Sequence, residues 1–257
     1  MSTKRDKELA RAKWERQQVR RAAKAQQQSV IKRSVLAGLV VIGIVAYAVA
    51  NKPASNPVAS PSKSATSNAS NVAGCQKTGP LNTTPKLYKT APLLGTPAKN
   101  LVLNTNCGRI SLALDAKAPA TSNVMTHLAK DGYFDMTACH RLTTSGFYVL
   151  QCGDPTGTGT GNPGFKFADE NLPKATSSST YSYNRGTIAM ANGGPGTNGS
   201  QFFIVYNKSP LPPNYSIWGH VTSGLDVVDR IAAAGVQGGG TDGKPNANVV
   251  IKQALAQ

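Results

Sequence analysis

The feature that most constrains how this chain can fold is a series of short apolar segments between residues 100 and 255, separated by loops rich in Gly, Pro and Asn. Segments of this length and composition are typical of β-strands. Two longer segments have helical periodicity, and Pro119 opens the first of them. Many strands with only two helices predict a mainly β domain, a closed β-barrel capped by two α-helices. The expected strands are 101–103, 110–114, 147–151, 187–191, 201–206 and 249–254, and the expected helices are 120–133 and 225–234.

A second constraint lies before this domain, at residues 34–50, which contain no charged residue. A helix of this length spans about 26 Å, near the lower limit for crossing a bilayer. Residues 1–33 hold 11 Lys or Arg and 3 Asp or Glu, which favours a cytoplasmic N-terminus. We predict a single transmembrane anchor, with residues 1–33 as a basic cytoplasmic segment and the later domain outside the cytoplasm. The alternative is a cleaved secretory signal ending at Ala48-Val49-Ala50, which also exports the domain.

The formal charge of +16 also raises the hypothesis of nucleic-acid binding. Residues 4–28 are basic and contain no Gly or Pro, which favours a solvated helix beside anionic headgroups. Trp14 is the one aromatic residue in this stretch, and the apolar segment follows soon after it. We therefore expect contact with a membrane and no nucleic-acid partner.

Between the apolar segment and the domain, the composition changes twice. Residues 51–73 consist almost wholly of Pro, Ser, Ala, Asn and Thr, which cannot bury a core and predict a disordered linker. Residues 74–98 add a few apolar side chains, and we expect them to wrap the surface of a domain that covers residues 99–257.

Several familiar patterns do not support the chemistry that they suggest. Residues 159–164 match GxGxxG by letter, but no helical segment follows them and no acid has the spacing of a dinucleotide site. Ser200 lacks the nucleophile-elbow pattern of serine hydrolases. His127, His140 and His220 do not have the spacing of metal ligands. We therefore predict no metal and no cofactor.

Five further strings are more specific, at residues 139–142, 147–155, 166–171, 186–192 and 197–204. They read CHRL, FYVLQCGDP, KFADEN, GTIAMAN and TNGSQFFI. In this order and at nearly these spacings they resemble the signatures of the cyclophilin family, over about residues 99–255. The resemblance implies a cyclophilin-like barrel and peptidyl-prolyl cis/trans isomerase activity.

The resemblance also implies roles for individual residues. Arg141 matches the arginine that contacts the substrate proline, and it is the expected catalytic residue. Tyr148 matches the pocket phenylalanine when counted back from Gln151, although an extra residue in this segment lets Phe147 take that role instead. The residues expected to bind substrate are Tyr148, Val149, Gln151, Ala191, Asn192, Gln201, Phe203, Leu211, Tyr215 and Trp218.

Three positions depart from the family pattern. Tyr215 stands where the family usually has histidine, Trp218 where it usually has phenylalanine, and Pro210 where many members have tryptophan. The first two keep the expected pocket aromatic. These departures concern substrate preference and inhibitor affinity more than the reaction itself.

Four cysteines, Cys75, Cys107, Cys139 and Cys152, all follow the apolar segment. An even number in an oxidising compartment favours two disulfides over buried free thiols. No CxxC pair is present, so a zinc site is not expected. Three connectivities remain open, with a slight preference for Cys107 with Cys139, because both would lie at strand ends in the expected barrel.

The implied reaction needs neither a nucleophile nor a metal. Rotation about a peptide bond has a barrier of roughly 18–20 kcal/mol, and X-Pro isomers exchange over tens of seconds or longer. An apolar cup for the proline ring and a fixed cation such as Arg141 would stabilise the twisted bond. We expect a monomer that acts on proline-containing unfolded or exported polypeptides. The alternative is a non-enzymatic module at the cell surface that binds proline peptides.

Overall fold

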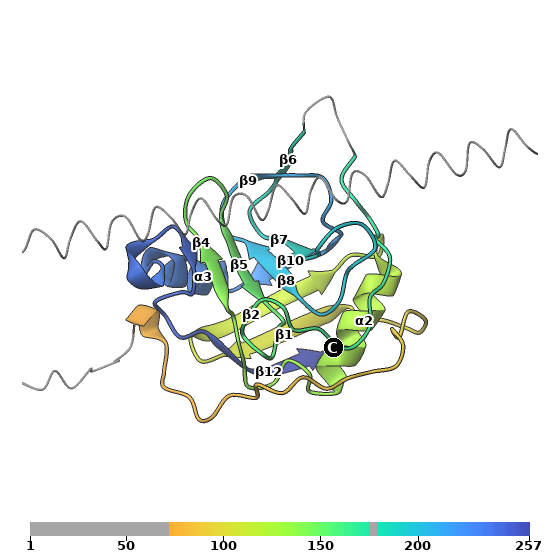
Figure 1. The fold of residues 1–257 in the computed structure, drawn as a ribbon, viewed down its shortest axis with the longest axis horizontal. Coiled ribbons are helices and arrows are strands. Elements are labelled where there is room, and N and C mark those ends of the chain that lie inside the picture. The colour runs from red at the N-terminus through yellow and green to blue at the C-terminus, as the bar shows by residue number, and fades with distance from the viewer. Residues whose placement is uncertain (1–71, 175–178) are drawn as a thin grey trace, which may run out of the picture. The chain divides into compact units, whose positions relative to one another are not determined.

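The computed structural model describes residues 72–174 and 179–257, which form a mainly β architecture with two α-helices (Figure 1). The main sheet contains β1 (Asn100–Thr105), β2 (Gly108–Leu114), β3 (Thr137–Ala138), β4 (Arg141–Thr143), β5 (Val149–Cys152), β7 (Thr187–Met190), β8 (Phe202–Val205), β10 (Ile217–Ser223), β11 (Asp242–Gly243) and β12 (Val250–Ala256). The predicted mainly β class with two helices is confirmed, and so are the six predicted strands, with shifts of one or two residues at their ends.

All ten strands pair antiparallel, in the order β11-β4-β5-β8-β7-β10-β2-β1-β12-β3. The two edge strands, β11 and β3, are each two residues long. Among the described residues no ladder joins these two edges. The sheet is therefore curled but open, and the predicted closed barrel is not found. A separate ladder pairs β6 (Tyr181–Tyr183) with β9 (Ser209–Leu211).

The helices are α2 (Pro119–Lys130) and α3 (Leu225–Ala233), which lie on opposite sides of the view in Figure 1. Helix α2 packs against β12 and β10, and α3 packs against β2 and against the short 3-10 helix η1 (Val72–Gly74). Helix α2 ends three residues before the predicted boundary, because Gly132 adopts a left-handed φ of 67° and reverses the chain. This turn carries Tyr133 into the core, where it is 1% exposed.

The N-terminus of α2 is capped by a residue that is distant in the sequence. The cap residue of the helix itself, Ala118, makes no side-chain hydrogen bond. The backbone N–H groups of Ala120 and Thr121 instead donate to the carboxylate of Glu170, over 3.2 and 2.8 Å. A carboxylate at this end also interacts favourably with the helix dipole. Helix α2 is thereby tied to the loop before β6.

The alternation of side chains along the strands separates two apolar clusters. In β8, Phe202 and Ile204 point into the main core, which α2 and α3 also reach. Phe203 and Val205 point to the opposite face and join a smaller cluster with Val149 of β5. Because the two faces of one strand serve both clusters, all four residues of β8 are buried. The smaller cluster lies on the face that carries the site described below.

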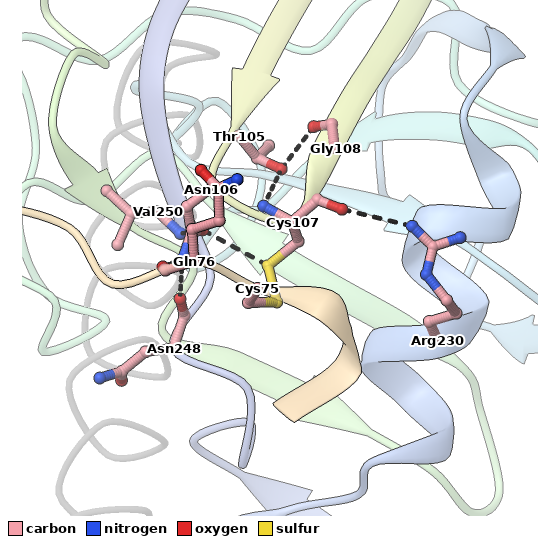
Figure 2. The surroundings of a disulfide bond; sticks show 9 residues. All are labelled: Cys75, Gln76, Thr105, Asn106, Cys107, Gly108, Arg230, Asn248 and Val250. Carbon is pink, nitrogen blue, oxygen red and sulfur yellow. Dashed lines mark hydrogen bonds between the residues drawn. A yellow bond between two sulfur atoms is a disulfide. The ribbon is translucent and has the colours of Figure 1, made fainter. Parts of the chain in front are cut away.

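The first disulfide joins Cys75 to Cys107 and ties the chain after η1 to the main sheet (Figure 2). Cys107 lies in the turn between β1 and β2, where its N–H donates to Thr105 Oγ1 over 3.1 Å. Its carbonyl accepts a hydrogen bond from Arg230 of α3 over 3.3 Å. Two distant parts of the chain are therefore joined to this turn, the segment after η1 by the disulfide and α3 by the Arg230 hydrogen bond.

The second disulfide joins Cys139 to Cys152. The preference for Cys107 with Cys139 was wrong, whereas the prediction of two disulfides is confirmed. The reason lies in strand pairing, since Arg141 of β4 is opposite Gln151 of β5. This register brings Cys152, the last residue of β5, close to Cys139, which lies two residues before β4.

Residues 75–99 contain no helix or strand and run along the lower edge of the sheet in Figure 1, coloured orange. Backbone hydrogen bonds hold them there: the N–H of Gln76 donates to Asn106, that of Asn82 to Met136, and that of Tyr88 to Pro163. The Tyr88 hydroxyl also hydrogen-bonds Asp131 Oδ2 over 2.5 Å, beside the end of α2. This extension therefore reaches from the Cys75 disulfide to the loop before Phe165.

The predictions for residues 1–33, 34–50 and 51–71 concern parts of the chain outside the described residues. Val72 and Ala73, at the end of the predicted linker, belong to η1. No helix in the ranges 72–174 and 179–257 has the length and apolar character needed to cross a membrane.

Candidate active site

The smaller apolar cluster opens to the surface as a cavity of about 320 Å³. Strands β4, β5, β8 and β9 and the segment after β7 supply its walls. Most of the predicted site residues are among its lining: Arg141, Phe147, Val149, Gln151, Ala191, Asn192, Phe203, Leu211, Pro212 and Tyr215. Gln201 lines an adjoining cavity, and Tyr148 and Trp218 lie elsewhere.

The floor and one side of this cavity are apolar. Val149 and Phe203 are 3% and 5% exposed, and both come from the central strands of the sheet. Tyr215 stands edge-on to Phe203, with ring centroids 5.4 Å apart. Leu211 of β9 and Phe147 complete the apolar wall. A concave surface of this kind suits a small apolar ring of a ligand.

Phe147, rather than Tyr148, lines the cavity. The Tyr148 ring turns to the other side of the sheet and packs edge-on against Tyr206, at 5.9 Å between centroids. The physical reason is the period of two along an extended strand. Because Val149 and Gln151 face the cavity, Phe147 shares their face and Tyr148 cannot. Tyr148 was expected in the pocket, but its ring lies on the other face of the sheet, and the alternative residue, Phe147, lines the cavity.

Trp218 is also absent from the cavity. Its side chain is 0% exposed and packs edge-on against Phe202 in the main core, with centroids 5.8 Å apart. Its neighbour Ile217 packs on the smaller cluster instead. Trp218 was expected among the substrate-binding residues, but adjacent residues of β10 face opposite sides of the sheet, so Trp218 lies in the core and away from the cavity.

Arg141 supplies the positive charge at the cavity rim. Its Nε and Nη2 donate to the two carboxylate oxygens of Asp242, each over 2.7 Å. Its Nη1 donates to Gln151 Oε1 over 3.3 Å, and its guanidinium lies 5.7 Å from the centre of the Phe147 ring. The hydrogen bond with Asp242 raises the pKa of Arg141 and lowers the pKa of Asp242. Both side chains are therefore charged at neutral pH.

A chain of amide hydrogen bonds continues from Arg141 across the site. Gln151 Nε2 donates to Gln201 Oε1 over 2.9 Å. Gln201 Nε2 in turn donates to the carbonyls of Gly159 and Gly161, over 3.0 and 2.9 Å. These residues line a second, more polar cavity of about 330 Å³ that shares Gln151 with the first one. The amide oxygen of Gln151 thus faces the guanidinium, and its orientation is set by the network.

The loop of the second cavity is organised around a buried carboxylate. Asp154 is 0% exposed, and its oxygens accept hydrogen bonds from Thr156, Gly159 and Gly161, at 2.6 to 3.1 Å. Burial opposes the charged form, but these bonds outweigh it and hold the pKa of Asp154 below its ordinary value. A Cβ atom on Gly161 would come within 2.0 Å of Asp154 Oδ1, so this close approach needs glycine.

An open stretch of backbone lies beside both cavities, at Ala191 and Asn192. The N–H of Ala191 donates to the Gln201 carbonyl, and the Asn192 side chain donates to the Asn214 carbonyl over 2.9 Å. Within the described ranges, the Ala191 carbonyl and the Asn192 N–H have no recorded hydrogen bond. They are available to pair with an extended peptide.

Two of the patterns rejected from the sequence have structural roles here. Residues 159–164 form the loop over Asp154, and Ser200 Oγ donates to the Gly153 carbonyl over 2.7 Å. His140 is buried enough for desolvation to lower its pKa, and its ring nitrogens have no recorded partner in the described part of the chain. That part contains no group of His, Cys, Asp or Glu side chains arranged to hold a metal ion.

Two features of the site were not predicted from the sequence. Asp242 lies 101 residues beyond Arg141, in a Gly-rich stretch with no strand pattern, and only the β11–β4 pairing brings the two together. Pro212 follows Leu211 directly, and no motif marks it. For Phe147, by contrast, the signal was present, because its spacing from Val149 and Gln151 is that of one strand face.

Comparison with known proteins gives one family. A family model described as cyclophilin type peptidyl-prolyl cis-trans isomerase/CLD matches residues 100–255. The range runs from the first residue of β1 almost to the end of β12, and so includes both cavities.

Among curated proteins, the probable peptidyl-prolyl cis-trans isomerase B of Mycobacterium tuberculosis is 48% identical over 182 residues, which cover 66% of this chain and 58% of that relative. The protein of the same name from Mycobacterium leprae is 49% identical over 159 residues, covering 58% of this chain and 53% of the relative. The chain therefore spans little more than half the length of these relatives. A peptidyl-prolyl cis-trans isomerase-like 1 of Gibberella zeae is 38% identical, over 60% of this chain and 93% of the relative.

Among solved structures, a cyclophilin type peptidyl-prolyl cis-trans isomerase of Cryptosporidium parvum is similar with a TM-score of 0.51 and 28% identity, covering 62% of this chain and 98% of that one. A second crystal structure of the same relative was determined in the presence of the dipeptide Ala-Pro, and it also has a TM-score of 0.51.

Proposed function

We propose that this chain, which belongs to the cyclophilin-type peptidyl-prolyl cis-trans isomerase family, catalyses cis/trans exchange of X-Pro peptide bonds at the cavity beside Arg141. One observation carries the proposal. An apolar cup, a hydrogen-bonded guanidinium and an open backbone stretch meet at one cavity, formed by side chains that sequence separates widely. The match to the family model and the relatives named as isomerases support it.

In this mechanism the proline ring of the substrate occupies the apolar cup, against Val149 and Phe203. The residues around the proline pair in extended form with the backbone at Ala191 and Asn192. With the ring and the chain both held, the remaining freedom is rotation about the peptide bond that precedes proline. The bond loses its amide resonance as it twists, and that resonance is the source of the barrier of roughly 18–20 kcal/mol.

Arg141 acts on the twisted state. As resonance is lost, the lone pair localises on the prolyl nitrogen and becomes a hydrogen-bond acceptor. An N–H of the Arg141 guanidinium then donates to it, an interaction that the planar ground state cannot make. Interactions confined to the transition state are those that raise the rate. The reaction breaks no covalent bond, and the protein's own side chains are sufficient for it.

The test is the exchange rate of a short X-Pro peptide, measured with the full chain purified in detergent. We expect clear acceleration over the uncatalysed exchange, which takes tens of seconds or longer. A matched pair of variants tests the site: Phe147→Ala should lower kcat/KM about tenfold, by the loss of cup area. Tyr148→Phe, on the other face of the sheet, should leave it unchanged. Binding of the peptide without acceleration would instead support the non-enzymatic proline-binding module.

We further propose that the clients are unfolded or exported polypeptides outside the cytoplasm, and that residues 34–50 anchor the chain in the cell membrane. The support is the charge pattern before the apolar segment and the two disulfides, which persist in oxidising compartments. The crystal structure of the Cryptosporidium relative determined in the presence of the dipeptide Ala-Pro supports X-Pro sequences as the ligand class.

The topology can be tested with protease added to intact cells. The isomerase domain should be digested, while an epitope placed within residues 1–33 should remain protected. A domain that resists digestion until the cells are broken would contradict the proposed location. A mature N-terminus at Asn51 would replace the anchor with a cleaved signal, as the alternative interpretation predicts.

A further inference from the structure

We infer that Asp242 is a positioning residue for the reaction: it holds the Arg141 guanidinium so that its free N–H groups face the cavity. The inference rests on the proposed function. It starts from the bidentate ion pair, in which both carboxylate oxygens of Asp242 accept a hydrogen bond from Arg141 at 2.7 Å. Asp242 does not line the cavity, so it acts on a substrate through Arg141.

The backbone around Asp242 is itself held in place. Asp242 is opposite Thr143 in the β11–β4 ladder, and the N–H of Thr144 donates to the Thr241 carbonyl over 2.8 Å. Gly243 follows, with a φ of 154°. Its backbone lies close to Val236, because a Cβ atom on Gly243 would be 3.1 Å from Val236 Cγ1. The carboxylate therefore projects from a short strand that is paired directly with the strand of Arg141.

The ion pair determines which part of the guanidinium is free. An arginine has five N–H groups in one plane. Asp242 takes the Nε group and one Nη2 group, and Gln151 takes one Nη1 group. Within the described ranges, two N–H groups are left without a recorded partner, one on each Nη atom. The Phe147 ring beside the guanidinium further limits its rotation.

The ion pair with Asp242 orders the Arg141 side chain before the substrate binds. A free arginine side chain samples many rotamers, and that freedom must be lost when it donates to the twisted bond. With Asp242 in place, most of the loss occurs in the folded enzyme. The Asp242 carboxylate, which lies on the side of the Arg141 guanidinium away from the cavity, also reduces the net charge at the site. The contribution of Asp242 to the reaction should therefore be geometric, and its removal should change kcat more than KM.

The chain contains a matched control for this interaction. Arg185 and Asp229 also form a bidentate ion pair, with both hydrogen bonds at 2.7 Å, although Arg185 donates through Nη1 and Nη2 and not through Nε and Nη2. The side-chain exposures are similar, 43% and 45%, against 39% and 50% for Arg141 and Asp242. Neither residue of this second pair lines the cavity. Removing Asp229 therefore reproduces the loss of a surface ion pair without touching the site.

The experiment measures kcat and KM separately for X-Pro peptide exchange, using the full chain. Asp242→Ala should lower kcat roughly tenfold with little change in KM, because a displaced catalytic group costs rate. Asp242→Asn keeps one acceptor oxygen and should restore part of the loss. Asp229→Ala should leave both constants unchanged. In an Arg141→Ala background, Asp242→Ala should cause no further loss, since the two residues act as one unit.

The outcomes separate this inference from the proposed function. If the wild-type chain is active, two results overturn the inference alone. One is an unchanged kcat in Asp242→Ala, and the other is an equal loss of kcat from Asp242→Ala with and without Arg141. A wild-type chain that does not accelerate exchange overturns the proposed function, and the inference with it. Thermal unfolding of each variant checks the fold, and Asp242→Asn serves as the test if Asp242→Ala does not fold.

Discussion

Replacing Arg141 by alanine should lower kcat/KM for X-Pro peptide exchange by about ten- to a hundredfold, since a hydrogen bond from a charged donor contributes about 1.5–3 kcal/mol. The loss should appear in kcat, because the bond to the prolyl nitrogen forms only as the peptide bond twists. The fold should persist, because the side chain lies at the rim and is 39% exposed.

Two further arginine variants sharpen this expectation. Arg141→Lys keeps the charge but loses the planar fork that pairs with Asp242 and Gln151 together, so its activity should fall between that of the wild type and the alanine variant. Arg185→Ala removes an arginine with a similar ion pair outside the cavity and should be fully active. Unchanged activity of Arg141→Ala would show that the cation has no part in the reaction.

Replacing Trp218 by alanine should cost about 3–5 kcal/mol of unfolding free energy, as expected for the largest side chains in a core. Trp218 is 0% exposed and packs edge-on against Phe202, next to the strands that form the cavity floor. In a domain of this size the loss corresponds to a fall in Tm of roughly 6–20 °C. Reversible thermal unfolding with both disulfides kept oxidised is the appropriate measurement.

The kinetic behaviour of Trp218 variants distinguishes a core residue from a substrate-binding one. Trp218→Phe should be less destabilising and should retain the KM of the wild type. Tyr215→Ala, at the cavity edge, should show the opposite pattern, with a smaller loss of stability and a raised KM. A normal Tm for Trp218→Ala together with a raised KM would place the indole in the binding site after all.

Most residues of the cavity were implied by the resemblance to the cyclophilin signatures, and the local strand pattern agrees with them. The alternation along β8 already separates Phe202 and Ile204 from Phe203, and the string around Arg141 marks the start of β4. The same alternation should have selected Phe147 over Tyr148, because residues that share a face of a strand are two apart.

Trp218 was misplaced for a related reason. A match to a pocket position by resemblance does not say which face of a strand a side chain occupies. In β10, Ile217 packs on the smaller cluster, so the side chain of the next residue, Trp218, points into the main core. The correct side is decided by the pairing of β10 with β7, in which Ile217 is opposite Ala189.

The sequence by itself determined the mainly β class and the positions of the main strands and helices, because these follow from periodicity and residue chemistry over a few neighbouring positions. Most of the cavity lining was implied by the resemblance to the cyclophilin signatures. Only the tertiary structure decided the disulfide pairing, the cap that Glu170 supplies to α2, and the Asp242 partner of Arg141. Each of these joins residues brought together by strand register or by a loop crossing the surface. Such contacts have no local signature, since the free energy that selects them comes from the packing of the whole sheet.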